Sequence, residues 1–466
     1  MNKMSKPNFI IFLTDDQGYG DLSCMGATDF STPNLDQMAE SGVRFTDWYS
    51  NSPVCSPSRA SLLTGRYPGN AGVRAILDGH RTATGLPTEV PTIASALKKS
   101  GYYTAMSGKW HLGLAEGSRP HDHGFTDWFG FMAGCIDYYS HIYYWEMNRD
   151  GKAQYHDLWE NGEEIQRNGE YFTELITEYA IKYIRRSIEL DKPFLLYIPY
   201  NAPHYPMHAP EKYLERFPNL KWDRKIMAAM LSAMDDSVGK IIDELKKHDL
   251  FDNTITFFQS DNGPSRESRN WLDGNLDPYY GGSTGKLKGH KFSLFEGGVR
   301  SPAIINWPKN IPSGQVLSGP GVAMDIFPTF LTAAGVDLNQ YESDGKNILP
   351  MVIEGEKSPH DSIFWEMNEQ TAVRKGKWKL VLDGYLVEGV PSENNVHLSD
   401  LENDMAESIN LIEQYPQITK ELKIIAENWR NDIENVWNAK WLPRVNCTTG
   451  NITKNNSSLS TLDENK

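Results

Sequence analysis

Residues 8–18 read Asn-Phe-Ile-Ile-Phe-Leu-Thr-Asp-Asp-Gln-Gly, and this stretch decides the fold. Its first seven residues form an apolar run with polar residues at both ends, the pattern of a strand buried on both faces of a parallel sheet. Asp15 and Asp16 follow directly, so we expect the strand to end in a loop that carries two carboxylates. The stretch therefore predicts an α/β protein with polar chemistry at the end of a buried strand.

Similar apolar runs recur along the chain and alternate with helical stretches. Strands are expected at residues 102–107, 194–200, 254–260 and 301–307. Helices are expected at 33–41, 91–100, 171–188 and 224–247, the first with Thr32 as its N-cap and Pro33 in its first turn. Strands that alternate with helices imply a mostly parallel, doubly wound α/β sheet.

The pattern changes after Gly355. Short strand-like segments occupy residues 360–395, most clearly 371–382, and a helix is expected from about 416 to 438. A chain of 466 residues is also too long for one core of ordinary size. We therefore predict a catalytic domain over 1–355, a small C-terminal α+β subdomain over 356–445 and a flexible tail over 446–466.

The overall charge and hydropathy exclude several classes of partner. The net charge of −15 disfavours nucleic acid and anionic membrane surfaces, because like charges repel. No apolar run approaches the roughly 20 residues of a membrane span. We see no signal peptide, which predicts a cytoplasmic protein, or a periplasmic or secreted one if a signal has been removed. The four cysteines are too few for a disulfide scaffold, so free thiols or at most one bridge are expected.

Polar residues follow three of the expected strands. Asp15 and Asp16 come after the first strand, His204 after the strand at 194–200, and Asp261 and Asn262 after the strand at 254–260. Ligands of open α/β sheets bind where the carboxyl ends of strands meet, so these residues are expected to share one site. Carboxylate and amide oxygens are hard ligands that suit Ca²⁺ or Mg²⁺.

A second motif lies at residues 55–66, Cys-Ser-Pro-Ser-Arg-Ala-Ser-Leu-Leu-Thr-Gly-Arg. A short helix is expected from Ser58 onward, which would place Cys55 near its positive N-terminus. A lone cysteine is usually a small buried hydrophobic residue, so Cys55 becomes a candidate for chemistry only through its surroundings.

Cys-x-Pro-Ser-Arg followed by Leu-Leu-Thr-Gly-Arg resembles the signature of the type I, formylglycine-dependent sulfatases, arylsulfatase-like members of the alkaline phosphatase superfamily. Further segments resemble landmarks of that family in the same order: Gly-Lys-Trp-His-Leu-Gly at 108–113, Ala-Pro-His at 202–204, Ser-Asp-Asn-Gly at 260–263 and Glu-Gly-Gly-Val-Arg at 296–300. The resemblance runs from about residue 7 to 302 and implies a large, mostly parallel sheet between helices with a smaller C-terminal α+β subdomain.

The resemblance also implies roles for individual residues. Cys55 matches the cysteine that becomes Cα-formylglycine, whose hydrate attacks sulfur. Arg59 and Lys109 match the groups that hold this nucleophile, and His111 matches the base that deprotonates its second hydroxyl. Two more residues complete the catalytic set. His204 matches the general acid for the leaving alcohol, and Lys291 matches a lysine that binds a sulfate oxygen.

By the same resemblance, one Ca²⁺ ion is expected as cofactor. Its ligands match Asp15, Asp16, Cys55, Asp261 and Asn262. The implied partners are a sulfated substrate and the maturation enzyme that generates formylglycine. Since a sulfate ester and the protein are both anionic, local cations must outweigh the overall negative charge at the site.

Two aromatic loops favour a sulfated carbohydrate as substrate. Residues 263–290 carry Arg266, Arg269, Trp271, Tyr279 and Tyr280, and residues 137–145 are similarly aromatic. Arginine and aromatic side chains suit sulfates and sugar faces, although an ordinary surface loop explains the composition equally well. Ser140 and His141 lie in the second loop and are not counted among the catalytic residues.

Three alternatives remain open at this point. The first is a phosphatase or phosphonate monoester hydrolase of the same superfamily, because phosphate and sulfate are similar tetrahedral anions. The second is a non-catalytic protein that binds sulfated glycans. The third is a competent enzyme in which Cys55 stays a thiol.

Overall fold

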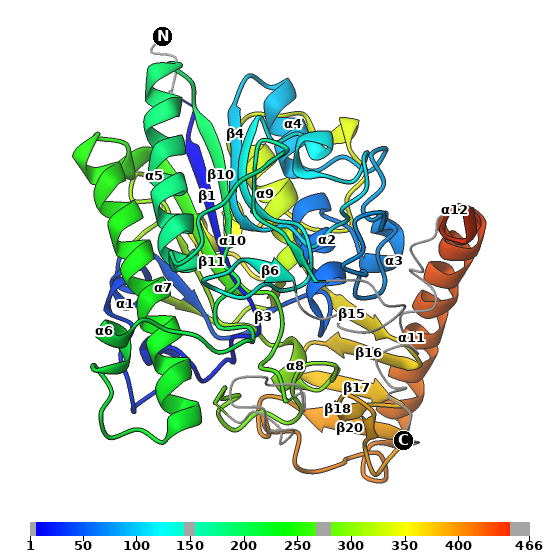
Figure 1. Ribbon diagram of the computed structural model, residues 1–466. Helices are drawn as coiled ribbons and strands as arrows, with labels where there is room; N and C mark the ends of the chain where they lie inside the picture. The colour runs from blue at the N-terminus through cyan, green and yellow to red at the C-terminus, as the bar shows by residue number, and fades with distance from the viewer. Residues whose placement is uncertain (1–5, 144–153, 267–280, 448–466) are drawn as a thin grey trace.

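The computed structural model describes residues 6–143, 154–266 and 281–447. Its largest unit is a ten-stranded sheet with helices on both faces, and a smaller antiparallel sheet lies beside it (Figure 1). The mixed, mostly parallel sheet confirms the predicted α/β class. The domain limits at 355 and 445 stay predictions, and residues 448–466 of the expected tail lie outside the described part.

The centre of the large sheet consists of parallel strands in the order β11-β1-β10-β4-β5. They comprise β1 (Asn8–Thr14), β4 (Tyr103–Lys109), β5 (Asp127–Phe131), β10 (Phe194–Pro199) and β11 (Thr254–Ser260). Every residue of β1 is buried, as the continuous apolar run predicts. The strand that opens the chain is therefore the middle of the core.

The edges of the large sheet are mixed, which the sequence did not indicate. Three strands lie beyond β11: β12 (Ala303–Asn306), β2 (Val43–Phe45) and β13 (Gln315–Leu317). β12 pairs antiparallel with both β11 and β2. The expected strand at 301–307 thus exists, shorter than predicted and running against its neighbour. On the other edge, β8 (Trp159–Glu160) and β9 (Glu163–Glu164) are also antiparallel.

Two groups of helices cover opposite faces of this sheet (Figure 1). One group contains α1 (Pro33–Glu40), α5 (Phe172–Glu189) and α7 (Trp222–Lys247). The other contains α2 (Cys55–Thr64), α4 (Ile93–Lys99) and α9 (Ile326–Ala333).

Two details of the expected helices were wrong. The helix predicted from Ser58 begins at Cys55, because Val54 is the last extended residue before it. Thr32 precedes α1 as expected, but its side chain makes no capping bond. The Thr32 hydroxyl instead lies 2.9 Å from the Ser23 hydroxyl.

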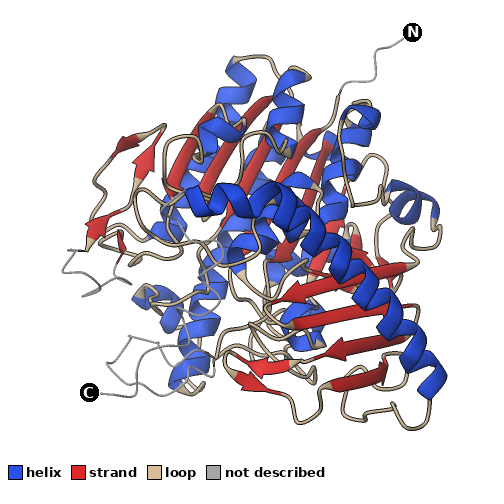
Figure 2. Ribbon diagram, turned by 90° about the vertical axis from the view of Figure 1, so that its right-hand side faces the viewer, coloured by secondary structure: helices blue, strands red, loops and turns tan. Residues whose placement is uncertain are grey.

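The smaller sheet, called the C-terminal sheet below, is fully antiparallel. Its strands are β15 (Ser362–Met367), β16 (Gln370–Lys375), β17 (Trp378–Leu382) and β20 (Val396–Asp400). Figure 2 shows the long helix α11 (Pro416–Val436) lying diagonally across these strands. Leu380 and Leu398 of the strands and Leu422 of α11 belong to one apolar cluster that joins the two layers. Antiparallel strands covered by a helix confirm the predicted α+β character.

A buried set of charges lies where the two sheets meet. It consists of the buried residues Tyr49, Glu296, Arg300, Arg374, Lys379 and Glu407 with the partly exposed Asp47, and is called the interdomain network below. Lys379 of β17 reaches across to Glu296 at 2.7 Å, and Arg300 contacts the other oxygen of Glu296 at 3.0 Å. Arg374 of β16 contacts Asp47 at 2.7 Å. The C-terminal sheet is therefore joined to the large sheet by buried ion pairs as well as by apolar packing.

Two further observations bear on the sequence predictions. Within the described ranges, no helix combines the length and apolar character that crossing a membrane requires. Cys24, Cys55 and Cys135 form no disulfide.

Candidate active site

The polar residues predicted to share a site do meet at one edge of the large sheet. β10, β1 and β11 are adjacent and parallel, so the loops after them lie side by side. The Asp261 N–H donates to the Thr14 carbonyl at 3.0 Å, and the Asp16 N–H donates to Asp261 Oδ1 at 3.2 Å. These bonds hold the two acidic loops against each other. The side chains of Asp15, Asp16, His204, Asp261 and Asn262 are all buried.

Several potential metal ligands converge at this point. Asp15, Asp16, Cys55 and His204 each offer a ligand atom, and these atoms all lie within 4.8 Å of one another. Asn262 adds a buried Oδ1 that has no hydrogen-bond partner among the described residues. Clustered carboxylates and an unpaired amide oxygen fit a hard divalent cation such as Ca²⁺. The structure also places His204, expected only as a general acid, within this ligand group.

Cys55 lies at the centre of the group because α2 begins there. Its Sγ is 3.6 Å from Asp15 Oδ1, and the side chain is buried. Burial raises the pKa of the Cys55 thiol, and the nearby charges of Lys109 and Lys291 do not offset this. An unmodified Cys55 is therefore a neutral thiol, which is a poor nucleophile and a poor metal ligand.

Three buried cations neutralise the three carboxylates. The pairs are Lys109 with Asp15 at 2.6 Å, Lys291 with Asp16 at 3.0 Å, and Arg59 with Asp261 at 2.8 Å. These six residues are called the site cluster below. The expected group of local cations is therefore present at the site, where it balances the three carboxylates one for one.

The two central carboxyl groups differ in their electrostatics. Burial alone would raise the pKa of Asp15, but the neighbouring cations, Lys109 foremost, hold it well below its ordinary range. Burial raises the pKa of Asp261, and the Asp15 carboxylate raises it further against the opposing charge of Arg59. Three carboxylates so close together repel one another, and a bound divalent cation would relieve this repulsion.

The two candidate acid–base histidines are both neutral in this environment. Burial lowers the pKa of His204, despite the nearby Asp15 and Asp16. Its Nδ1 lies 2.7 Å from the Tyr205 carbonyl, which leaves Nε2 directed at the site, 3.7 Å from Asp16 Oδ2. Burial also lowers the pKa of His111 well below its ordinary value. A neutral imidazole can accept a proton, which suits the base role expected of His111.

His111 is less directly tied to the group than the other predicted residues. Its Nε2 lies 3.3 Å from the Leu77 carbonyl, and its ring packs on Gly134. Nδ1 has no hydrogen-bond partner among the described residues. The link of His111 to the site cluster is electrostatic, through the nearby charges of Lys109 and Arg59. The structure thus gathers the predicted residues in one place, with His111 at the border, and their catalytic roles stay predictions.

Sequence reasoning missed one residue that shapes the site. The Tyr138 hydroxyl is buried and donates to the carbonyls of Asn201 at 2.8 Å and His204 at 3.0 Å, which holds the loop that carries His204. Tyr138 belongs to the aromatic loop that was considered only for substrate contact, and its spacing gave no signal of this role. His141 of the same loop faces the Glu170 carbonyl at 3.1 Å.

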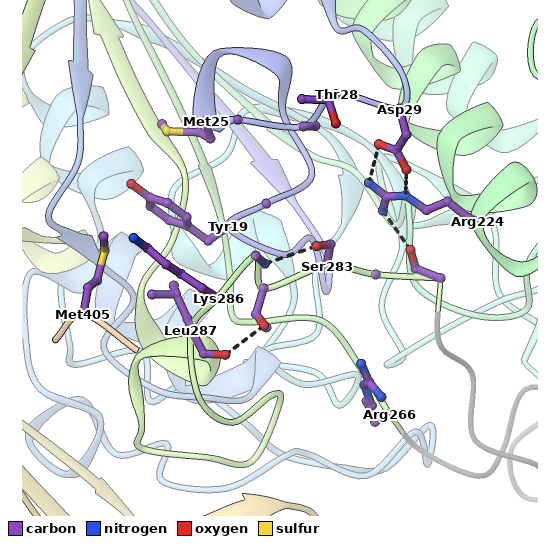
Figure 3. Close-up of a pocket in the computed structure, with 17 residues that line it drawn as sticks. Tyr19, Met25, Thr28, Asp29, Arg224, Arg266, Ser283, Lys286, Leu287 and Met405 are labelled. Atoms are coloured by element: carbon purple, nitrogen blue, oxygen red, sulfur yellow. Dashed lines mark hydrogen bonds and ion pairs between the residues drawn. The ribbon is translucent and has the colours of Figure 1, made fainter. Parts of the chain in front are cut away.

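A surface cavity of about 720 Å³ adjoins the loops of the site (Figure 3). Tyr19 follows the acidic pair by three residues and Lys286 precedes Lys291 by five, and both line this cavity. On another side of the cavity, Arg224 is ion-paired with Asp29 at 2.7 Å. The cavity contains none of the predicted site residues. Arg269, Trp271, Tyr279 and Tyr280 of the expected substrate loop lie outside the described residues, as does residue 145.

Comparisons with known proteins agree with this geometry. Residues 7–336 match the sulfatase family, and residues 289–432 match the C-terminal region of N-sulphoglucosamine sulphohydrolase. Mouse (Mus musculus) N-acetylgalactosamine-6-sulfatase is 34% identical over 80% of this chain and 71% of its own length. Human (Homo sapiens) arylsulfatase A is 32% identical over 80% of this chain and 74% of its own length.

A solved structure extends the likeness to the whole fold. The crystal structure of Ps i-CgsB in complex with k-i-k-neocarrahexaose superposes with a TM-score of 0.82 at 32% identity, covering 95% of this chain and 99% of that one. The match includes the C-terminal sheet as well as the large one. With the family match over residues 7–336 and the buried cysteine at the meeting point of the strand ends, the chain belongs to the sulfatase family and is a sulfuric ester hydrolase.

Proposed function

We propose that this sulfatase removes sulfate from a sulfated glycan, using a formylglycine made from Cys55 and one Ca²⁺ ion. The observation that carries the proposal is the position of Cys55. Its Sγ lies beside Asp15, within a group of buried carboxylates whose charges are balanced by buried cations. A nucleophile at this point lies beside the proposed metal ligands and close to the cations that would bind an anionic substrate.

The residues present fit both groups. Asp15, Asp16, Asp261 and Asn262 would hold the ion, and Ca²⁺ would stabilise negative charge that develops beside it. Formylglycine supplies a hydrated aldehyde, whose two hydroxyls allow attack on sulfur and later release of sulfate. A plain thiol at Cys55 would offer neither, since burial keeps it protonated.

The remaining side chains bind the substrate and move protons. Lys291 binds a sulfate oxygen, while Arg59 and Lys109 orient the nucleophile and stabilise its charge. His204 delivers a proton from Nε2 to the leaving alcohol oxygen. Because its Nδ1–H donates to the Tyr205 carbonyl, the ring must first take up a second proton at Nε2. His111 takes up the proton that must leave the second hydroxyl. The lowered pKa of both histidines keeps each of them neutral before the reaction and makes each give up readily a proton that it has taken up.

Two observations support a carbohydrate as the carrier of the sulfate. The proteins similar to this chain include an N-acetylgalactosamine-6-sulfatase and Ps i-CgsB, whose crystal structure is a complex with a neocarrahexaose. The cavity beside the site is large enough for a sugar unit, and its wall includes the ring of Tyr19 and the amine of Lys286 (Figure 3). An aromatic face and a cation suit a sugar ring and a further sulfate.

The test combines a mass measurement with a substrate panel. Protein made with its maturation enzyme is digested, and the peptide containing Cys55 is expected to carry an aldehyde in place of the thiol. Sulfate release is then measured on sulfated galactose and N-acetylgalactosamine oligosaccharides and on an aryl sulfate, and release of the alcohol is measured on an aryl phosphate and a phosphonate monoester.

We expect at least one oligosaccharide to be cleaved, and Cys55→Ala to abolish that cleavage. A thiol in fully active protein would overturn the proposed nucleophile. Cleavage of the aryl sulfate alone would overturn the glycan assignment. Faster cleavage of the phosphorus esters than of every sulfate would favour the phosphonate hydrolase alternative.

A further inference from the structure

The backbone around Lys291 is anchored to both halves of the catalytic centre. The Lys291 N–H donates to the Pro264 carbonyl at 3.0 Å, and Pro264 lies two residues past Asn262. The next N–H, that of Phe292, donates to the Pro53 carbonyl at 3.1 Å, and Pro53 lies two residues before Cys55. The position of the Lys291 amine is thus set by a short backbone segment held between the metal-binding loop and the start of α2.

This segment contains a strained residue. Phe292 has φ of 73°, in the left-handed region that non-glycine residues rarely adopt, and its ring is 6% exposed. Such a conformation is unfavourable for a bulky residue, and it persists only where surrounding contacts fix it. Something other than the local sequence must therefore keep the chain in this shape next to Lys291.

Gln370 supplies that contact from the other sheet. It is the first residue of β16, its side chain is fully buried, and its Nε2 donates to the Phe292 carbonyl at 2.8 Å. Its Oε1 accepts from the Leu294 N–H at 3.3 Å and from the Tyr385 N–H at 2.8 Å. The amide group of Gln370 thus donates to one residue of the turn that follows Lys291, Phe292, and accepts from another, Leu294.

The hairpin that presents Gln370 is itself fixed by α11. Arg430 of α11 donates to the Gln370 carbonyl at 3.1 Å through Nη1 and to the Asn368 carbonyl at 2.8 Å through Nη2. A continuous set of hydrogen bonds therefore runs from α11 through the tip of the C-terminal sheet to the backbone of the active-site lysine.

We propose that Gln370 is a positioning residue, which holds the Phe292 backbone so that the Lys291 amine meets the sulfate of the substrate. The inference rests on the sulfate-binding role proposed above for Lys291. Gln370 contacts neither substrate nor metal ligands, so it acts only through the segment after Lys291. The C-terminal sheet is then part of the catalytic apparatus rather than a separate attachment.

A double-mutant cycle tests this role. The variants are Gln370→Leu, Lys291→Ala and the double variant, each produced as the mature full-length enzyme. We expect Gln370→Leu to lower kcat/KM on an aryl sulfate by about tenfold or more, and to raise the inhibition constant of inorganic sulfate by a similar factor. In the Lys291→Ala background, Gln370→Leu should change neither quantity further. Independent, multiplied losses would overturn the inference.

A matched variant separates positioning from general destabilisation. Asn306 is also a buried amide and donates to the Ser41 carbonyl at 2.6 Å and the Ser41 hydroxyl at 2.8 Å, but it lies near the opposite end of the strands from Asp261. Asn306→Leu should lower Tm to a similar degree and leave the inhibition constant of sulfate unchanged. An equal rise of that constant in Asn306→Leu would contradict the proposal.

Gln370→Glu is used if Gln370→Leu does not fold, because it keeps the acceptor oxygen for Leu294 and Tyr385 and replaces the bond to the Phe292 carbonyl with repulsion between two oxygens. The two hypotheses fail in different ways. If Lys291→Ala leaves the inhibition constant of sulfate unchanged, the proposed role of Lys291 is wrong and the role of Gln370 is wrong with it. If Lys291→Ala raises the constant but Gln370→Glu does not, only the inference about Gln370 is wrong.

Discussion

The molecule contains two largely buried clusters of charged side chains. They have the same number of acidic and basic groups, but one lies at the candidate active site and the other joins the two sheets. Each has three acidic and three basic side chains. The site cluster contains Asp15, Asp16, Asp261, Arg59, Lys109 and Lys291. The interdomain network contains Asp47, Glu296, Glu407, Arg300, Arg374 and Lys379, with the Tyr49 hydroxyl among them.

The difference lies in the groups that surround the carboxylates. In the interdomain network, Glu296 accepts from Tyr49 at 2.9 Å, Arg300 at 3.0 Å and Lys379 at 2.7 Å, so both of its oxygens are occupied by residues of the chain. In the site cluster, oxygens of Asp15 and Asp16 lie with Cys55 Sγ in one small group of potential ligands. The first cluster joins two sheets, whereas the second brings a thiol and an imidazole together with its carboxylates, a grouping that could hold a metal ion.

The largest effect is expected from removing a cation of the site cluster. Lys109→Met should lower sulfatase activity by about a thousandfold, the usual cost of losing one group that stabilises charge in a transition state. Activity is measured on an aryl sulfate after mass spectrometry has confirmed equal maturation of Cys55. Retention of more than about a tenth of the activity would show that Lys109 does not act on the reacting atoms.

Removing the corresponding cation of the interdomain network should affect folding instead. Lys379→Met leaves the buried Glu407 without its cation and Glu296 with Arg300 alone, which should lower the free energy of unfolding by about 3–5 kcal/mol. Urea denaturation measures this change. Lys377→Met is the matched control, because Lys377 is partly exposed and pairs with Asp400 near the surface, where solvent screens the ion pair and its loss should change stability little. Equal losses for both variants would contradict the distinction.

Metal removal sharpens the same comparison. Chelating Ca²⁺ with EGTA should lower the free energy of unfolding by about 3 kcal/mol when the ion is present at several hundred times its Kd, since the site carboxylates then repel one another. The Lys379→Met variant should lose the same amount on chelation, because the two clusters are separate. A Tm that does not depend on Ca²⁺ would argue against the proposed metal site.

The smallest effect concerns pH and the interdomain network. Burial and the nearby Glu296 raise the pKa of Glu407 above its ordinary range, although Lys379 opposes this. A carboxyl whose pKa is higher in the folded state stabilises the fold below its unfolded pKa and loses that contribution as pH rises through the folded value. Glu407→Gln should therefore gain stability relative to the wild type between about pH 5 and pH 8, by on the order of 1 kcal/mol.

Thermal denaturation across this pH range measures the change. Glu402→Gln, which removes an exposed carboxylate of the same region, is the control and should show a constant difference from the wild type. A Glu407→Gln difference that falls with pH would reverse the assigned direction of the Glu407 pKa.

The two clusters also differ in how far the sequence predicts them. The residues of the site lie directly after apolar strands or inside dense motifs, so strand periodicity and topology were enough to bring Asp15, His204 and Asp261 together. Lys379 lies inside an expected strand and Glu407 in a loop, with no spacing that links either one to Glu296. The pairing of the two sheets, which only the folded chain shows, brings them together.

Gln370 and Tyr138 escaped prediction for the same reason. Each acts through hydrogen bonds to backbone carbonyls of distant segments. Every residue has a backbone carbonyl, so no residue type in the sequence identifies the partner. The antiparallel course of β12 was also missed, because an apolar run does not encode strand direction. Periodicity and motifs thus found the residues expected to do chemistry, and the structure was needed to find those that hold them in place.

The burial of Cys55 implies that its proposed modification precedes the folding of the loops that cover it. Its side chain is 2% exposed, and it is covered by loops that arrive much later in the chain, including the segment of Lys291. The proposed maturation enzyme would have to contact the residues around Cys55, and it could reach them only before those loops close. Closure requires contacts between segments more than two hundred residues apart, such as Phe292 and Pro53, and such long-range contacts form slowly. Because these late contacts complete the active site, Cys55 stays accessible between synthesis and folding. The proposed conversion of Cys55 to formylglycine would take place in that interval.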